Sequence, residues 1–294
     1  MIKVIFFCNF GYSPEQLLLE YKKMTPNNSS FWKSLEGVAD IVQADVVVFL
    51  QGLPHGFNKK QLEGKKIICF PREPNYAPQW RGIHGPNVFT NDNHFRVVTN
   101  PTFIGKDFDF LSSLKYIKKM KKVSAVISNK KGSKDYNARR NFLIQLTKKY
   151  PHMCDIWGAG WTTELGTSYR GQLGGYHGSS TSQSSKYDGL INYEYSICIE
   201  NCHKKNQFTE KFTDALLCWT IPIYYGCSNI SEYFPKGSYY EIDILNPNCF
   251  KRIQEITSSP ITQQNIDAMT EARQLILNKY NIWDAIHDKV TYMA

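Results

Sequence analysis

The chain has 294 residues, a formal net charge of +9 and 42% hydrophobic residues. This length suits two domains, and the supply of apolar and aromatic residues excludes a disordered chain. The positive charge favours anionic ligands such as nucleotides without choosing among them. No apolar stretch approaches the ~20 residues of a membrane-spanning helix, so we expect a soluble protein without a membrane span.

Eight cysteines lie mostly inside apolar segments, and none forms a Cys-x-x-Cys pair. This pattern predicts free, buried thiols, because zinc and redox sites use paired cysteines and a chain of this length needs no disulfide framework. We therefore expect a reducing, cytoplasmic compartment.

In the first 120 residues, apolar strand-like runs alternate with helical or polar segments, as they do in α/β folds. Strands are predicted at residues 3–8, 45–50 and 66–70, with a shorter one at 96–99. A helix is predicted to begin at Ser13 or Pro14, because serine caps helices and proline suits the first helical position.

A dense basic run, KYIKKMKK, occupies residues 115–122 and marks a change between two regions. It carries no helix-turn-helix or RNA-binding signature. We interpret it as a solvated linker or helix face and expect no nucleic-acid partner.

The second region repeats the alternation of strands and helices. Its predicted strands are residues 123–127, 154–157, 196–199, 221–225 and 238–242. Helices are predicted at 138–150, after Thr209 and across 265–292, and the Gly/Ser/Thr-rich residues 164–185 are predicted to form a long loop over a site. The sequence thus predicts an α/β fold with two facing Rossmann-like domains, residues 1–120 and 121–279, a cleft between them and a C-terminal helix, residues 280–294, that crosses back to the first.

Neither half shows a G-x-G-x-x-G fingerprint after its first strand, nor a Walker-A lysine loop. A nicotinamide or flavin dinucleotide enzyme is therefore disfavoured.

The most informative stretch runs from Glu200 to Gly226. A strand ends there, and Thr209 is a plausible cap for a helix that begins with Glu210 and Lys211. Ligands of open α/β sheets bind where strands end and helices begin, so Lys211 and the helix N-terminus suit a diphosphate, and Glu210 suits sugar or ribose hydroxyls. The plainer interpretation is that Glu210 complements the helix dipole and Lys211 is solvated.

Residues 195–243 resemble the donor-binding region of the α-1,3/4-fucosyltransferases, glycosyltransferase family 10. The matching motifs are Glu200-Asn201, Thr209-Glu210-Lys211, Asp214-Ala215-Leu216, Pro222-Ile223-Tyr224-Tyr225-Gly226 and Tyr233-Phe234-Pro235-Lys236-Gly237-Ser238. Upstream segments are also similar to the family, namely Ile127-Ser128-Asn129, Arg139-Arg140, Phe142 and Asp155-Ile156-Trp157-Gly158. Over the first domain the likeness is faint.

The resemblance implies a GT-B architecture, a nucleotide-sugar donor held by the second domain, inversion at the anomeric carbon, and neither cofactor nor metal. By family pattern, Lys211 and either Arg139 or Arg140 neutralise the departing diphosphate. The remaining donor-binding candidates are Ser128, Asn201, Gln207, Thr209, Glu210 and Tyr225.

Donor identity follows from the resemblance less directly. GDP-fucose is the leading donor, and an oligosaccharide or glycoprotein glycan is the expected acceptor. Gln207 stands where the family commonly has an aromatic residue. UDP-xylose or another UDP-sugar on the same scaffold is therefore the alternative.

An inverting transferase needs a base that takes the proton of the acceptor hydroxyl. The family carries this carboxylate in a loop after a first-domain strand, and here Glu73 follows the strand 66–70 between two prolines. Glu73 is the predicted catalytic base, with a surface ion pair to Arg72 or Arg81 as the alternative. Asp92 and Glu63 are the next candidates.

The two alternative functions are a metal-dependent transferase and a non-catalytic carbohydrate-binding protein. Asp107-Phe108-Asp109 spells the D-x-D motif of metal-dependent GT-A transferases, but so short a motif arises by chance and we interpret it as coincidence. A non-catalytic carbohydrate-binding relative has no need of a phosphate clamp. The presence of Arg139, Glu210 and Lys211 together therefore favours an enzyme.

Overall fold

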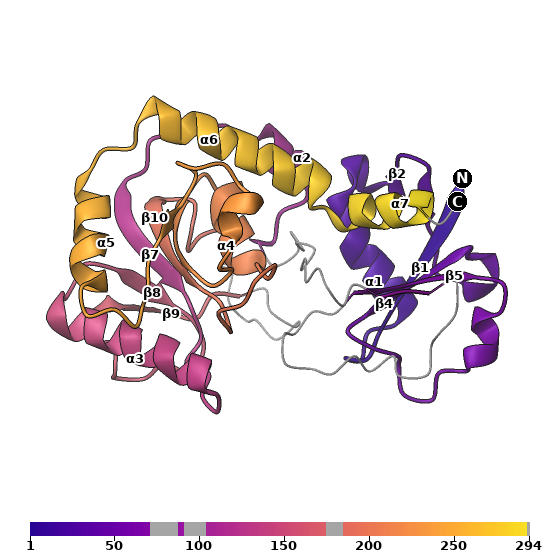
Figure 1. The fold of residues 1–294 in the computed structure, drawn as a ribbon, viewed down its shortest axis with the longest axis horizontal. Coiled ribbons are helices and arrows are strands. Elements are labelled where there is room, and N and C mark those ends of the chain that lie inside the picture. Colours follow the sequence, from indigo (N-terminus) through magenta and orange to yellow (C-terminus); the bar gives the residue numbers. More distant parts are fainter. Residues whose placement is uncertain (71–87, 91–103, 175–184, 293–294) are drawn as a thin grey trace. The chain divides into compact units, whose positions relative to one another are not determined.

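The computed structural model describes residues 1–70, 88–90, 104–174 and 185–292. The chain divides into two compact units (Figure 1). Unit 1 comprises Met1–Thr102, Asp107–Ser112 and Leu277–Ala294, and unit 2 comprises Phe103–Lys106 and Ser113–Ile276. Each unit is built around its own six-stranded sheet.

The sheet of unit 1 is parallel except for one short antiparallel pair. Its order is β2-β3-β1-β4-β5-β6, and only β2 runs against its neighbour. The strands are β1 (Ile2–Cys8), β2 (Phe31–Trp32), β3 (Leu35–Gly37), β4 (Val46–Leu50), β5 (Lys66–Phe70) and β6 (Val88–Thr90). The three strands predicted at 3–8, 45–50 and 66–70 are confirmed, and residues 96–99 lie outside the described part.

The sheet of unit 2 is fully parallel, in the order β12-β11-β10-β7-β8-β9. Its strands are β7 (Lys121–Val126), β8 (Asp155–Trp157), β9 (Tyr169–Gly171), β10 (Tyr193–Ile199), β11 (Ile221–Tyr225) and β12 (Tyr240–Glu241). Counted from β7, this is the Rossmann order 3-2-1-4-5-6, in which the order of the strands reverses between the first and the fourth. The α/β class with two Rossmann-like sheets is confirmed.

Seven α-helices accompany the described strands. They are α1 (Pro14–Tyr21), α2 (Phe108–Ser113), α3 (Lys134–Lys149), α4 (Glu210–Leu217), α5 (Cys249–Ser258), α6 (Gln263–Gln274) and α7 (Ile282–Tyr292). Ser13 caps α1 through a capping box, and Thr209 caps α4, as predicted. None of the helices in the described ranges is long and apolar enough to span a bilayer.

The C-terminal helix α7 belongs to the core of unit 1. Trp283 and Ile286 are fully buried in one apolar cluster with Phe6 and other residues of β1, β4 and β5. The Trp283 ring meets Phe6 edge to face, 5.2 Å between centroids, and its indole N–H donates to the carbonyl of Tyr21 at 2.8 Å. The chain therefore returns to unit 1 after completing unit 2, as the predicted crossing helix requires.

Two expectations about polar segments are wrong. The predicted loop 164–185 contains strand β9, which pairs with β8 and extends the sheet. The basic run is only partly solvated, because Lys119 is buried and donates to the carbonyls of Ile191 and Cys218. Backbone carbonyls distant in sequence satisfy this ammonium, so the local pattern gave no sign of its burial. The eight cysteines are free and buried, as predicted.

Candidate active site

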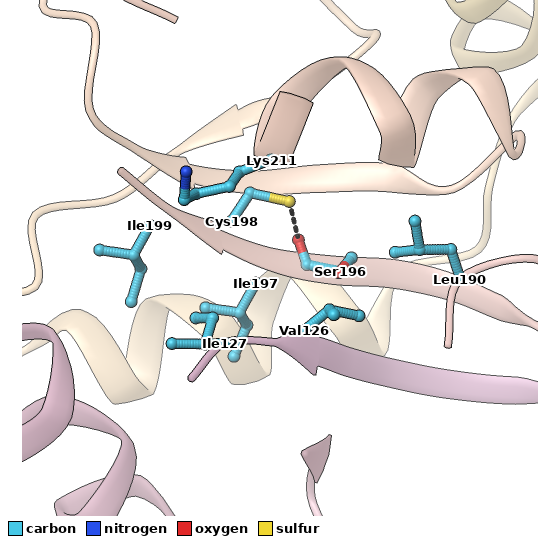
Figure 2. Close-up of a pocket in the computed structure, with 8 residues that line it drawn as sticks. All are labelled: Val126, Ile127, Leu190, Ser196, Ile197, Cys198, Ile199 and Lys211. Carbon is cyan, nitrogen blue, oxygen red and sulfur yellow. Dashed lines mark hydrogen bonds between the residues drawn. The ribbon is translucent and has the colours of Figure 1, made fainter. Parts of the chain in front are cut away.

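The candidate site lies where the strand order of unit 2 reverses, at the carboxyl ends of β7 and β10. In open α/β sheets this switch point is the usual ligand site. A small pocket of about 10 Å³ lies there. Figure 2 shows its lining residues, which are Val126, Ile127, Leu190, Ser196, Ile197, Cys198, Ile199 and Lys211. Lys211 is the charged member of this lining, and its ammonium lies 3.5 Å from the carboxylate of Glu200, the residue that follows β10.

Glu200 follows β10 and anchors the beginning of α4. Its carboxylate is buried and accepts the backbone N–H of Thr209 at 2.7 Å and the Thr209 hydroxyl at 2.6 Å. The Tyr224 hydroxyl also donates to it, at 3.4 Å. Glu200 thus joins the strand end to the helix cap, and its carboxylate is occupied by hydrogen bonds within the protein.

Gly226 leaves room for that carboxylate. A Cβ at position 226 would lie 2.3 Å from Cγ of Glu200 and 2.6 Å from the Tyr224 hydroxyl. Any larger residue displaces one of these groups, because real Cβ atoms do not approach so closely. The glycine of the Pro-Ile-Tyr-Tyr-Gly motif therefore has a packing reason at this site.

Lys211 is held between two carboxylates at the N-terminus of α4. Its Nζ lies 3.0 Å from Glu210 and 3.5 Å from Glu200, and its side chain is 16% exposed. Burial lowers the pKa of Lys211, but the two carboxylates outweigh burial and raise it above its usual value. The same pairing overcomes the burial of Glu210 and lowers the pKa of that carboxyl to about 2. Both groups are charged at neutral pH.

Arg139 approaches this cluster from α3. It is 3% exposed, and its Nη1 donates to Oδ1 of Asn201 at 2.8 Å, while its guanidinium lies 5.2 Å from the centre of the Tyr136 ring. Burial lowers the pKa of Arg139, and Glu200 and Glu210 act in the opposite direction. Arg139 in turn lowers the pKa of Lys211, so the two predicted cations act on one another in one cluster.

Arg140, the alternative to Arg139, has a different environment. Its Nε donates to Asn129 at 2.7 Å and its Nη2 to Glu164 at 3.0 Å. These contacts tie α3 to the segments that follow β7 and β8. Of the two arginines, Arg139 is the one that bonds Asn201, in the segment between β10 and α4.

Two further charged residues of the cluster were not predicted as site residues, namely Lys186 and the buried Asp214, although Asp214 lies in one of the family motifs. The Lys186 ammonium donates to Oδ2 of Asp214 at 2.6 Å and to the backbone carbonyl of Glu210 at 3.2 Å. Asp214 follows Glu210 by four residues, so helical spacing places both on one face, whereas nothing local marks Lys186.

The other predicted donor-binding residues lie around the same sheet edge in different settings. Ser128 is half-buried just after β7. Gln207 is 1% exposed and accepts the Cys202 thiol at 3.0 Å, so it faces the interior. Tyr225 ends β11 and stacks on His203, which the sequence did not indicate, at 4.9 Å between ring centroids.

The predicted base Glu73 lies outside the described residues, as does Asp92. Glu63, the other substitute, is exposed and precedes β5, in the wall of a pocket of about 440 Å³ that also includes Ile2 and Lys66. This is the amino end of the unit 1 sheet. Because ligands bind at carboxyl ends, Glu63 is poorly placed to act as the base.

The D-x-D carboxylates make internal bonds. Asp107 accepts the backbone N–H of Phe110 at 2.9 Å and the side-chain amide of Asn28 at 3.1 Å. Asp109 accepts the backbone N–H of Asn27 at 2.7 Å. These contacts fix the start of α2 against residues 27–28. The two aspartates thus have a structural role, which agrees with the interpretation that the match to the D-x-D motif arose by chance.

Comparison with known proteins identifies the same region. Residues 116–258 match the model of glycosyltransferase family 10 (fucosyltransferase), C-terminal part. A fucosyltransferase-like protein of Arabidopsis thaliana is 32% identical over 64 residues, 22% of this chain and 12% of that protein. An alpha-(1,3)-fucosyltransferase of Helicobacter pylori is 32% identical over 71 residues, 24% of this chain and 14% of that protein.

The chain thus aligns with only a small part of the length of these relatives. A solved alpha1,3-fucosyltransferase with GDP-fucose aligns at a TM-score of 0.44 and 17% identity, over 91% of this chain and 81% of that one. The matched segment contains the switch point, the cap of α4 and both predicted cations. The match of residues 116–258 to the family 10 model confirms the resemblance found in the sequence.

Proposed function

We propose that the chain is an inverting glycosyltransferase that moves a sugar from a nucleotide-diphosphate donor to a glycan hydroxyl, with GDP-fucose as the leading donor. The observation that carries the proposal is the placement of two cations at the switch point of a Rossmann sheet: Lys211 lies in the first turn of α4, and Arg139 bonds Asn201, which follows β10. Fixed positive charge at that position suits a pyrophosphate. The family 10 match supports a fucosyltransferase-like donor site.

In the proposed reaction the acceptor oxygen attacks the anomeric carbon while the bond from that carbon to the diphosphate oxygen breaks. The diphosphate leaves with the electron pair, and Lys211 and Arg139 stabilise its charge. The catalytic base takes the proton of the attacking hydroxyl. By family pattern that base is Glu73. We propose that no metal or other cofactor takes part.

The second donor class, a UDP-sugar such as UDP-xylose, keeps support from one observation. Gln207 stands where the family commonly has an aromatic residue, and it turns inward to the Cys202 thiol. We propose that this replacement of an aromatic residue changes the recognition of the donor.

Titration calorimetry with GDP-fucose, GDP-mannose, UDP-xylose, UDP-glucose and UDP-galactose tests the donor. We expect binding of GDP-fucose, and heat from uridine nucleotides alone would replace it as the donor. Failure to bind any of them would favour the non-catalytic carbohydrate-binding alternative.

The base is tested separately. Glu73→Gln is expected to abolish transfer while donor affinity stays the same, and Asp92→Asn is the matched variant expected to remain active. Near-normal turnover by Glu73→Gln would remove Glu73 from the mechanism.

A further inference from the structure

The structure assigns a positioning role to Lys186: its ammonium balances the buried carboxylate of Asp214 and fixes the first turn of α4, so that Lys211 stays available to the donor diphosphate. This inference rests on the proposed function. It concerns a residue outside the motifs by which the site was found.

The first step is geometric. One ammonium contacts two levels of α4, the backbone carbonyl of Glu210 at 3.2 Å and the carboxylate of Asp214 at 2.6 Å. Its own backbone lies in the segment just before β10. Lys186 therefore joins that segment to the turn of helix that carries Glu210 and Lys211.

The second step concerns charge. Three carboxylates gather here, those of Glu200, Glu210 and Asp214, and three cations face them, those of Arg139, Lys186 and Lys211. With all six groups ionised, the cluster is balanced before any ligand arrives. Without Lys186 it carries one excess negative charge, in a site that is proposed to receive a pyrophosphate.

The third step is the burial of the pair. The Asp214 side chain has no solvent exposure, and its Oδ1 has no hydrogen-bond partner among the described residues. Lys186 is 14% exposed. A buried carboxylate with one oxygen unsatisfied depends strongly on its single cation. With Lys186 absent, Lys211 is the nearest alternative on the same helix, and drawing it toward Asp214 would withdraw it from the ligand.

The test is a double-variant cycle read by nucleotide affinity. Lys186→Met, Asp214→Asn and the combined variant are titrated calorimetrically with GDP and UDP. We expect Lys186→Met to weaken binding of the preferred nucleotide by about tenfold or more, since an uncompensated buried charge faces the ligand. The combined variant should recover to within about threefold of the unmodified protein, because the charges balance again.

Lys122 and Glu194 provide the matched control. They form an ion pair of 2.6 Å at the amino end of the same sheet, with Lys122 58% exposed. Lys122→Met, alone and with Glu194→Gln, makes the same changes of charge away from the strand ends that form the site. Neither variant should alter nucleotide affinity by more than about twofold.

A pH series separates positioning from simple stabilisation. Burial raises the pKa of Asp214 to about 6, although Lys186 opposes the rise. The titratable groups that act on Asp214 or are acted on by it are Lys186, Glu210, Lys211, Cys198 and Cys218. In Lys186→Met, affinity should fall as the pH rises through the pKa of Asp214, and in the combined variant this dependence should disappear.

Equal affinity of Lys186→Met and the unmodified protein overturns the inference, and so does an equal loss in the single and combined variants. If Lys186→Met does not fold, Lys186→Arg and the combined variant decide, and both should bind. An unmodified protein that binds neither GDP nor UDP contradicts the proposed function instead, so the two failures are distinguishable.

Discussion

The two ends of α4 both hold buried cations, but they hold them in opposite ways. At the C-terminal end, Lys119 donates to the carbonyl of Cys218, and Arg273 donates to the carbonyls of Leu216 and Leu217. The helix dipole favours positive charge there. At the N-terminal end the dipole disfavours it, and Lys211 is held by the carboxylates of Glu210 and Glu200.

This difference separates a structural cation from a functional one. Lys119 and Arg273 complete the hydrogen bonds of a helix end, where the helix dipole already favours positive charge. Lys211 occupies a place where the helix itself would attract an anion, and carboxylates are required to keep it there. Burial accordingly lowers the pKa of Lys119 to about 8, whereas the carboxylates raise that of Lys211.

The largest effect is expected from a substitution at the N-terminal end of α4. Lys211→Ala should weaken donor binding about 100-fold, about 3 kcal/mol, since it removes a charge aimed at the diphosphate. Calorimetric titration with GDP-fucose measures the change, and Lys122→Ala is the control. Unchanged affinity would mean that Lys211 serves only its two carboxylates.

Arg273→Met removes a cation from the C-terminal end of α4. Besides the two α4 carbonyls, Arg273 donates to the carbonyl of Leu114 at 3.3 Å and lies 4.4 Å from the centre of the Trp219 ring. Its loss should lower the free energy of unfolding by about 3 kcal/mol and leave donor affinity unchanged. Urea denaturation provides the measurement, with the exposed Arg252→Met as control. A lower donor affinity at full stability would contradict the structural role.

The pH dependence of stability sharpens the contrast further. Because the pKa of Lys119 is lowered to about 8 in the folded state, the unfolded chain binds the extra proton between pH 8 and the usual value of 10.5. Stability contributed by Lys119 therefore rises with pH in that window, by about 2 kcal/mol or less. Urea midpoints of the unmodified protein and Lys119→Met should diverge between pH 8 and pH 10. If the two urea midpoints changed in parallel with pH, the lowered pKa of Lys119 would be contradicted.

The smallest effect is expected at the D-x-D motif. Asp109→Asn should lower the stability of unit 1 by about 1 kcal/mol, because the bond to Asn27 weakens. Transfer activity should be the same with and without excess chelator. Loss of activity on chelation would restore the metal-dependent interpretation of Asp107 and Asp109.

The sequence predicted the long, buried strands and the short strands β8 and β12, but it missed several other short strands. Strands β1, β4, β5 and β11 are runs of apolar residues bounded by polar ones, and such runs are detectable alone. Strands β2, β3 and β9 have two or three residues each, too few to show a period. Helix α3 begins four residues before the predicted position, because Ser133 caps it by accepting the N–H of Tyr136.

The site residues also differ in how well the sequence predicted them. Thr209, Glu210 and Lys211 are adjacent, so one motif located them together. The contacts of Arg139 with Asn201 and of Lys186 with Asp214 join residues 62 and 28 positions apart, and no local pattern records such pairs. Asp214 belongs to the Asp-Ala-Leu motif, and its spacing of four residues from Glu210 could have indicated that both lie on one face of the helix.

The packing of α7 into the core of unit 1 makes that unit discontinuous in the chain. Chains are synthesised from the N-terminus, and domains fold as units when their segments are available. We therefore expect every residue of unit 2 to be synthesised before Trp283, which completes the core of unit 1. The half that begins first would then finish last.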